Sequence, residues 1–384
     1  MKSKRNTSFR LSVWVLGLYI AVAVMSPFLA GSKAWICYVN KHLLFPKWQD
    51  KTPSIGSPDH NSICIYPIIP YDPLVTNIST DANLSPFSEQ PGKSWRNRHW
   101  LGTDKLGRDV LSGMIYGTVT ALQIGLISIF FAFIIGVTLG ILSAYFRDDG
   151  ISLNMVQLMG VFLAFIMGLF FLYWELAMYT ISQWTWIIMI SCVLLLIYAI
   201  KLLGRLKGIK KYPIPFDMMM VKVIEIRKSF PSIFILLTLS SLFSFPSIWN
   251  IILIITILGW IDFARYARAE TLSVKEENFI VSAKVLGYDA WRIMYKQILP
   301  NIMPTLLVVG CFSISSAILL ESTLSFLGMG LPVEQVTWGR MMSEGRTMQS
   351  WWLVVCPGLA LFIIILCLNN IASMYQKTGT RGML

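Results

Sequence analysis

The stretch VSAKVLGYDAWRIMYKQILP, residues Val281 to Pro300, differs in composition from the rest of the chain. The protein has 384 residues, of which 55% are hydrophobic and 14% are charged, and its mean hydropathy is +0.63. Within this apolar background the stretch carries four charged side chains, a central glycine and a closing Leu-Pro pair. Its interpretation depends on where it lies relative to a membrane.

The composition is that of a membrane protein, because a soluble globular protein has roughly 25% charged residues. A bilayer core of about 30 Å needs roughly 20 apolar residues per helix, so apolar runs can be counted as spans. Eight runs are predicted to span the bilayer: Leu11–Ala30, Thr118–Phe146, Ser152–Tyr173, Trp184–Leu203, Pro231–Phe245, Ile248–Phe263, Pro304–Leu327 and Trp351–Met374. The predicted fold class is therefore an all-α polytopic membrane protein.

The first run, and the two runs within Phe230–Trp260, have alternative interpretations. The first follows basic residues near the N-terminus, a pattern that signal peptides and membrane anchors share, and its length favours an uncleaved anchor. The stretch Phe230–Trp260 is a single apolar run that is too long for one helix. Pro246 and Ser247 supply a turn in its middle, which favours a tight hairpin of two spans.

The placement of Lys and Arg residues orients the chain in the membrane. With the N-terminus in the cytoplasm, 21 of the 32 basic residues lie in cytoplasmic segments, and the C-terminus is cytoplasmic too. Nine more lie in residues 31–117, a loop longer than the roughly 60 residues to which the rule applies. The net charge of +12 is thus explained by topology, and no basic stripe with interleaved aromatics indicates nucleic-acid binding.

This orientation places the opening stretch on the cytoplasmic face, between the sixth and seventh spans. Ser273 and Glu276 have the spacing of a capping box, which predicts that a helix starts there. The apolar residues that follow recur at helical spacing and predict one apolar face: Phe279, Ile280, Ala283 and Leu286.

Gly287 can take the left-handed conformation that closes this helix, and Asp289 can cap a second one. Pro300 is predicted to end the second helix. Its residues predicted to share an apolar face are Trp291, Met294, Tyr295 and Ile298. We therefore expect two short amphipathic helices with an elbow at Gly287. They fit two interpretations equally: a pair lying on lipid headgroups, or a compact knob presented to a groove of another protein.

The spacing of Ala283, Gly287 and Leu299-Pro300 resembles the cytoplasmic EAA loop of permease subunits in bacterial ATP-binding cassette importers. The string AKVLGYDAWRIMYKQILPNIMP is similar to the dipeptide, oligopeptide and nickel permease family, in particular its C-type subunit. Further stretches agree in order: HWLGTDKLGRDVLSGMIYG (His99–Gly117), GWIDFARYARAETLS (Gly259–Ser273), and SSAILLESTLSFLGMG followed by WGRMMSEGR up to Arg346.

The resemblance implies a type I importer transmembrane domain with a six-helix core in the bilayer of the bacterial cytoplasmic (inner) membrane. It implies a homologous second permease subunit, two ATPase subunits inside and a solute-binding protein outside. Peptides are the first substrate implied, and nickel or another small solute is the alternative. In the family the EAA loop is the coupling helix seated on the ATPase. Here this implies a coupling loop at 270–303 with the site residues Ala283, Lys284, Gly287, Tyr288, Asp289, Leu299 and Pro300.

The chain departs from the family in two places. Val281 occupies the position of the usual glutamate, which puts any ion pair of that glutamate in doubt. Residues 147–215 have no counterpart in six-helix members and are predicted to be an inserted transmembrane hairpin on the lipid-facing periphery. The predicted segments are 1–30 with the first helix, the extracytoplasmic loop 31–117, the second helix 118–146, the insertion 147–215 and the remaining core 216–384.

The outer segment 31–117 is expected to be loop and turn rather than a domain with its own core. Its end gathers the polar motif Gly102, Thr103, Asp104, Gly107, Arg108 and Asp109. The residues themselves indicate local capping by Thr103 or Asp104 and a carboxylate partner for Arg108. The resemblance implies an outward element near the partner permease or the binding protein. Cys37 and Cys64 either pair or stay free.

Glu321 lies inside an apolar span, where a carboxylate is costly unless paired. It is either a translocation-path residue or a hydrogen-bond partner of the neighbouring permease. No phosphate-binding loop, H-E-x-x-H motif or histidine-based metal site is found, so no enzyme activity, metal or cofactor is expected in this subunit. ATP and Mg²⁺ are expected in the partner ATPases. A self-contained secondary carrier is the rival class, but only Glu321 resembles its intramembrane charges.

Overall fold

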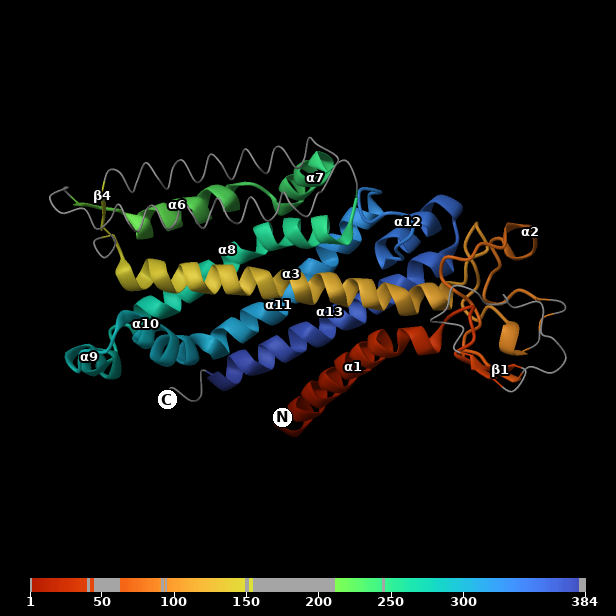
Figure 1. Ribbon diagram of the computed structural model, residues 1–384, viewed down its shortest axis with the longest axis horizontal. Coiled ribbons are helices and arrows are strands. Elements are labelled where there is room, and N and C mark those ends of the chain that lie inside the picture. Colours follow the sequence, from red (N-terminus) through yellow and green to blue (C-terminus); the bar gives the residue numbers. More distant parts are fainter. Residues whose placement is uncertain are drawn as a thin grey trace. The chain divides into compact units, whose positions relative to one another are not determined.

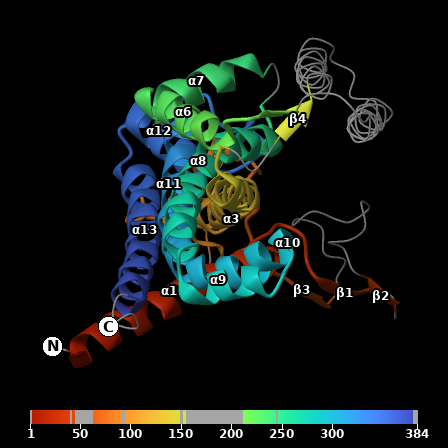
Figure 2. The same ribbon diagram turned by 90° about the vertical axis from the view of Figure 1, so that its left-hand side faces the viewer.

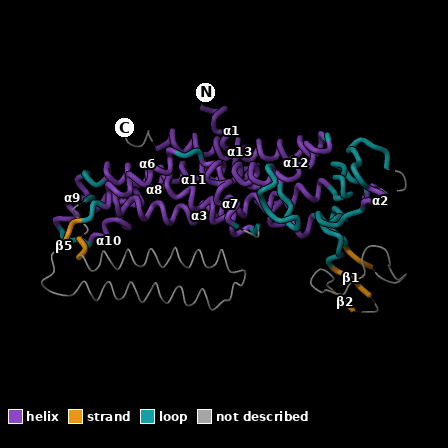
Figure 3. The backbone as a smooth tube through the Cα atoms, turned by 90° about the horizontal axis from the view of Figure 1, so that it is seen from above, coloured by secondary structure: helices purple, strands orange, loops and turns teal. Residues whose placement is uncertain are grey.

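The computed structural model describes residues 2–39, 42–44, 63–90, 93, 95–148, 152–154, 211–243 and 246–379. Helices make up most of this part of the chain, and its strands are confined to two short antiparallel sheets (Figure 3). The predicted helical fold class is confirmed. The predicted number of eight spans stays a prediction, since two of the runs fall almost wholly outside the described residues.

Five helices in the described part are long enough and apolar enough to cross a bilayer (Figure 1). They are α1 (Lys2–Leu29), α3 (Val110–Phe146), α8 (Ile248–Val274), α11 (Leu299–Phe326) and α13 (Trp351–Gly379). Each overlaps one of the predicted spans, and most run past the apolar residues. The helices are longer than the apolar runs because capping groups, rather than hydropathy, set where a helix ends.

The predicted span Pro231–Phe245 is the shorter helix α7 (Ser232–Leu242), and α6 (Phe216–Ser229) precedes it. Phe230 between them is extended, with φ −103° and ψ 130°. The residue before a proline avoids the helical region, so Pro231 causes the break. Two helices separated by a short connection are predicted for the run that ends at Trp260, and both α7 and α8 are found.

The chain forms two compact units. The first comprises Met1–Phe133, Pro246–Gly259 and Pro304–Leu384, and the second comprises Ile134–Phe245 and Trp260–Met303. Helices α3 and α8 therefore contribute residues to both units.

The core of the first unit is built around Trp338, the first residue of α12 (Trp338–Met348). Its indole is 1% exposed, donates from Nε1 to the carbonyl of Met114 at 3.1 Å, and lies edge-on to Tyr19. Tyr19 in turn donates its hydroxyl to the carbonyl of Ala360 at 3.0 Å. One aromatic cluster thus ties α1, α3, α12 and α13 together.

In the second unit, α3 and α8 approach each other closely at Gly136 and Gly140. A Cβ on Gly136 would collide with the carbonyl oxygen of Trp260 and lie 2.7 Å from Cβ of Phe263. A Cβ on Gly140 would lie 2.5 Å from the carbonyl oxygen of Ala264. Small residues four apart let membrane helices pack backbone to backbone and gain van der Waals contact. These two glycines therefore set the α3–α8 contact.

The outer segment contains an antiparallel sheet, so the prediction that it is only loop and turn is wrong. Its strands are β1 (Ile36–Val39), β2 (His42–Leu44) and β3 (Ile63–Ile65), in the order β2-β1-β3. The register places Cys37 directly opposite Cys64 in the backbone ladder. Strands of three or four residues give too little alternation to be recognised in a Pro-rich sequence. The described part also holds α2 (Ile78–Asp81) and a 3₁₀ turn at Trp95–Asn97.

The two ends of the predicted insertion, residues 147–215, are joined at its base. Strand β4 (Ser152–Asn154) pairs antiparallel with β5 (Lys211–Pro213). Asp148 Oδ1 also accepts the N–H of Met218, in the first turn of α6, at 3.0 Å. The predicted span Ser152–Tyr173 was expected to begin at the first residue of β4. That boundary is wrong, because Ser152–Asn154 pair with Lys211–Pro213 as β-strands. The remainder of the predicted hairpin lies outside the described residues.

Candidate functional site

The predicted coupling loop, residues 270–303, begins its first short helix later than the sequence pattern indicates. Ser273 lies in the last turn of α8, which ends at Val274. The next helix, α9 (Asn278–Val285), follows Glu277 in an extended conformation. The predicted helix start at Ser273 is therefore wrong, because the preceding helix extends through that position.

Gly287 closes α9, as predicted. Its φ is +75°, its N–H donates to the carbonyl of Lys284 at 3.0 Å, and the N–H of Tyr288 donates to Ala283 at 3.1 Å. This pair of bonds is a Schellman motif, which satisfies carbonyls at the end of a helix. A Cβ on Gly287 would meet no atom within 4 Å. The glycine is therefore required for its backbone conformation and not for space.

Asp289 caps the helix that follows, also as predicted. Its Oδ2 accepts the N–H of Trp291 at 3.2 Å at the start of α10 (Ala290–Ile293). This bond satisfies one of the free N–H groups at the helix start. The Schellman motif and this cap together fix the elbow between α9 and α10 (Figure 2).

The second helix does not end at Pro300, which corrects the prediction. A π-helical turn, Met294–Ile298, follows α10, and α11 begins at Leu299, so the helix continues into the membrane span. In a regular α-helix the proline ring would clash with the carbonyl four residues earlier. Here the N–H of Leu299 donates to Met294, five residues back, and the wider turn accommodates the ring. The elbow is thus continuous with α11.

One side of the loop is buried and the other carries large exposed apolar side chains. The buried residues are Ile280, Ala283, Ile293, Met294 and Ile298. The exposed residues, which we call the loop surface, are Phe279, Val281, Val285, Leu286, Tyr288, Trp291 and Tyr295. Of the residues predicted to share apolar faces, Ile280, Ala283, Met294 and Ile298 are buried, whereas Phe279, Leu286, Trp291 and Tyr295 are exposed. A short helix with two apolar stripes can bury either one, and spacing alone does not choose between them.

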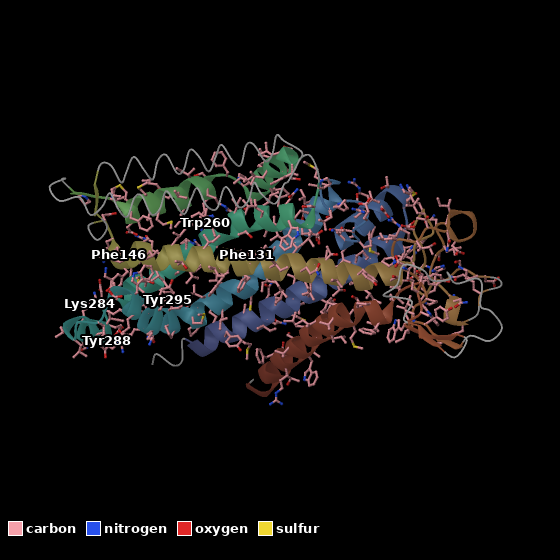
Figure 4. The ribbon with its side chains drawn as sticks, in the orientation of Figure 1. Phe131, Phe146, Trp260, Lys284, Tyr288 and Tyr295 are labelled. Atoms are coloured by element: carbon pink, nitrogen blue, oxygen red, sulfur yellow. The ribbon has the colours of Figure 1, made fainter. Side chains whose placement is uncertain are left out.

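The loop surface is rich in aromatic and arginine contacts. The rings of Trp291 and Tyr295 stack, with centroids 5.9 Å apart and planes 13° apart. The Arg292 guanidinium lies 4.3 Å from the centroid of the Tyr288 ring. Figure 4 labels Tyr288 and Tyr295 along the loop. Side chains of these types dominate the binding energy of many protein interfaces.

An ion pair that the sequence analysis missed joins α6 to α8. Arg268 donates from Nε and Nη2 to the two carboxylate oxygens of Asp217, at 2.6 and 2.7 Å. Ser143 of α3 donates its hydroxyl to the same carboxylate at 2.5 Å. The hydrogen bonds from Arg268 chiefly hold the pKa of the Asp217 carboxyl below its usual value. No sequence spacing indicates this pair, because its members belong to different helices.

The outer motif forms a tight turn in the first unit, and its polar groups have local partners. Gly102 and Gly107 have φ of +77° and +74°, in the region that favours glycine. Thr103 Oγ1 accepts the N–H of Leu84 at 2.8 Å. Asp104 Oδ1 accepts the N–H of Arg108 at 2.8 Å.

Arg108 has the carboxylate partner that was predicted, and a second one. Its Nε lies 2.5 Å from Asp104 Oδ2, and its Nη2 lies 3.0 Å from both oxygens of Glu344 in α12. Burial alone would lower the pKa of Arg108. The charges of Asp104 and Glu344 and their hydrogen bonds together outweigh burial, so the pKa is raised above its usual value. The guanidinium therefore links the outer turn to α12.

The entering helix α3 is capped by Asp109, so the prediction of Thr103 or Asp104 as its cap is wrong. Asp109 Oδ2 accepts the N–H of Ser112 at 2.7 Å, and its other oxygen lies 2.8 Å from Nδ1 of His99, which is fully buried. Asp109 directly precedes the first residue of α3, which is the position a capping carboxylate requires. Thr103 and Asp104 instead stabilise the turn before it.

Glu321 is 1% exposed within α11, in the first unit. Its carboxylate accepts hydroxyl hydrogen bonds from Ser325 at 2.8 Å and from Ser322 at 3.2 Å. These donors belong to its own helix, so no neighbouring subunit is needed to give the group hydrogen bonds. The coupling loop belongs to the second unit, whereas Glu321 and the outer motif belong to the first.

Residues 202–378 match the family of binding-protein-dependent transport system inner membrane components. The matched range contains the whole coupling loop and Glu321. Over this range the chain is similar to permease subunits of ATP-binding cassette importers. The family resemblance indicated by the motifs is thereby confirmed.

Two relatives of this chain are named as permease proteins of peptide transport systems. The dipeptide transport system permease protein DppC of Alkalihalophilus pseudofirmus is 26% identical over 303 residues, which cover 78% of this chain and 77% of that relative. The oligopeptide transport system permease protein OppC of Salmonella typhimurium is 36% identical over 160 residues, which cover 40% of this chain and 52% of that relative. Among solved structures, the MetNI methionine ABC transporter matches the permease with a TM-score of 0.42 and 15% identity, over 71% of this chain and 95% of that one.

Proposed function

We propose that this permease carries di- and oligopeptides across the cytoplasmic membrane as part of an ATP-driven importer. The substrate class is supported by the relatives, since a dipeptide permease aligns over most of both chains and an oligopeptide permease is more similar over a shorter range. Nickel complexes or another small solute are the alternative cargo. Uptake of a radiolabelled dipeptide compared with labelled nickel, in cells that carry the whole transport system, distinguishes these substrates.

The proposal that this loop couples the permease to an ATPase is supported by the exposed loop surface, which lies beside the elbow at Gly287. A loop that rests on lipid headgroups would direct its basic groups toward them, whereas Arg292 stacks on Tyr288 and the Trp291–Tyr295 pair is exposed beside it. This composition supports a protein partner. The loop surface is the seat of an ATPase subunit, whose closure passes through Gly287 into α11. ATP and Mg²⁺ are used by that partner, and the permease itself holds no cofactor.

The complete transporter follows the type I plan. One copy of this permease pairs with a homologous permease, two ATPases bind inside, and a solute-binding protein docks outside, near the outer motif. Both termini of the permease are cytoplasmic. Its six-helix core carries the insertion 147–215 as an extra pair of spans, which gives eight in total.

Affinity purification of the tagged permease in mild detergent tests this proposal. The expected result is that an ATPase and a second permease co-purify with it. The variant Leu286→Asp is expected to lose the ATPase and keep the second permease, because it places a charge in the loop surface. Lys222→Asp, at an exposed position of α6, is the control and is expected to keep both. Recovery of the tagged chain without either partner contradicts the importer assignment.

Removal of the inserted segment is expected to leave a working but less stable transporter. Residues 155–210 can be replaced by a short Gly-Ser linker, because β4 pairs with β5 and Asp148 already bonds to α6. The measurement is uptake normalised to the amount of assembled complex in the membrane. Complete loss of uptake at normal membrane level and assembly would show that the insertion belongs to the translocation path.

A further inference from the structure

The coupling loop contacts α3 in addition to the helix α11 into which it leads. Lys275 follows α8 directly, and its Nζ lies 2.5 Å from the carbonyl oxygen of Tyr145 and 3.3 Å from that of Ala144. Both carbonyls belong to the last turn of α3, where carbonyl groups lack donors within the helix. A cation at this end also interacts favourably with the helix dipole. Lys275 therefore holds the end of α3.

The ring of Tyr145 attracts two lysines from different parts of the loop. Nζ of Lys275 lies 5.5 Å from the ring centroid, and Nζ of Lys284, on α9, lies 5.6 Å from it. Both distances are within the range of about 6 Å in which an aromatic face attracts a cation. Burial, followed by the nearby Lys284, lowers the pKa of Lys275, in agreement with this crowding. Figure 4 labels Lys284 on the loop and Phe146 at the end of α3.

The same helix end has further contacts within the second unit. Ser143 donates to Asp217, which Arg268 holds in a bidentate pair. Arg147, directly after α3, lies 3.9 Å from Glu276, but both side chains are largely exposed and such a pair contributes little. The end of α3 is thus attached to α6, to the end of α8 and to α9. The attachment to α9 runs through the ring of Tyr145, whereas Lys275 at the end of α8 also bonds to backbone carbonyls of α3.

We propose that Tyr145 is a positioning residue through which the coupling loop moves α3 directly, in parallel with the covalent route into α11. This inference rests on the proposed function. When ATPase closure displaces α9, the Lys284–Tyr145 contact makes the end of α3 follow it. The close packing of Gly136 and Gly140 on α8 then spreads the motion to a second helix. Without the ring, α9 can move while α3 stays behind.

The test uses the complete importer reconstituted in proteoliposomes, with uptake of a radiolabelled dipeptide measured per ATP hydrolysed. Tyr145→Leu is expected to lower this ratio about threefold, the size expected for one exposed cation–π contact. Tyr145→Phe keeps the aromatic face and is expected to restore the ratio. Lys284→Met is expected to lower it as well, and the Leu/Met double variant no further than Tyr145→Leu alone, since Tyr145→Leu already removes the Lys284 contact.

Tyr266→Leu is the matched control, because Tyr266 also lies beside a cation, Arg265 at 4.6 Å, but outside the coupling loop. It is expected to leave the ratio unchanged. An unchanged ratio in Tyr145→Leu, or an equal fall in Tyr145→Phe or Tyr266→Leu, overturns the inference. Absence of the ATPase from the wild-type preparation would instead contradict the proposed function, so the two failures are distinguishable. If Tyr145→Leu does not assemble, Lys284→Met, whose side chain is exposed, decides the question.

Discussion

Gly287→Val is expected to reduce uptake at least about tenfold while the transporter still assembles and hydrolyses ATP. Gly287 has φ +75°, where a β-branched residue costs on the order of 1–3 kcal/mol. Nothing lies within 4 Å of the added Cβ, so this cost is conformational and falls on the elbow alone. The backbone is expected to relax away from the left-handed region, which breaks the Schellman motif and turns α9 relative to α10. Uptake and ATP hydrolysis measured in the same proteoliposomes give the result.

Two further variants, one at Gly287 and one in α11, separate the effect of backbone conformation from the effect of side-chain bulk. Gly287→Asn is expected to keep most of the uptake, because asparagine tolerates the left-handed region better than other residues with a Cβ. Gly310→Val adds the same side chain to α11 where no atom lies within 4 Å and φ is not positive, and is expected to be nearly neutral. Normal uptake by Gly287→Val would show that the elbow is not the coupling element.

The elbow could be predicted from sequence because its causes are local. A left-handed glycine and a capping aspartate act within a few residues of their own positions, and both Gly287 and Asp289 do so here. Long apolar runs also predict membrane helices reliably, since the bilayer thickness fixes their minimum length. The five long helices in the described part follow from composition for this reason.

Contacts between distant segments could not be predicted in the same way. Nothing in the sequence indicates that Asp217 and Arg268 form an ion pair. Likewise, nothing distinguishes Tyr145 from the other apolar residues at the end of its span or predicts its contact with Lys284. The choice of which stripe of α9 to bury depends on what packs against it. Pro300 was expected to stop a helix, and the π-helical turn before it, which depends on the backbone of the preceding turn, removes that stop.

Gly136 and Gly140 are four residues apart within a long apolar run, and this small-xxx-small spacing predicts a close contact with another membrane helix. That spacing does not name the partner helix, which the structure identifies as α8. Because backbone atoms line this contact, a larger residue cannot be accommodated by a change of side-chain rotamer. The pair is therefore the position in the second unit where added volume is expected to do the greatest damage.

Gly140→Leu is expected to reduce the amount of assembled complex in the membrane about tenfold or more. Its Cβ would lie 2.5 Å from the carbonyl oxygen of Ala264 and 2.9 Å from Cβ of Ala267, so α3 and α8 must separate. Overpacking of a buried contact typically costs about 1–3 kcal/mol, and more where backbone must move. Quantitative blotting of membranes and size-exclusion chromatography of the solubilised complex measure the loss. Gly310→Leu places the same side chain in open space on α11 and is expected to accumulate normally. Equal accumulation of both variants would mean that the close approach of α3 and α8 does not stabilise the permease.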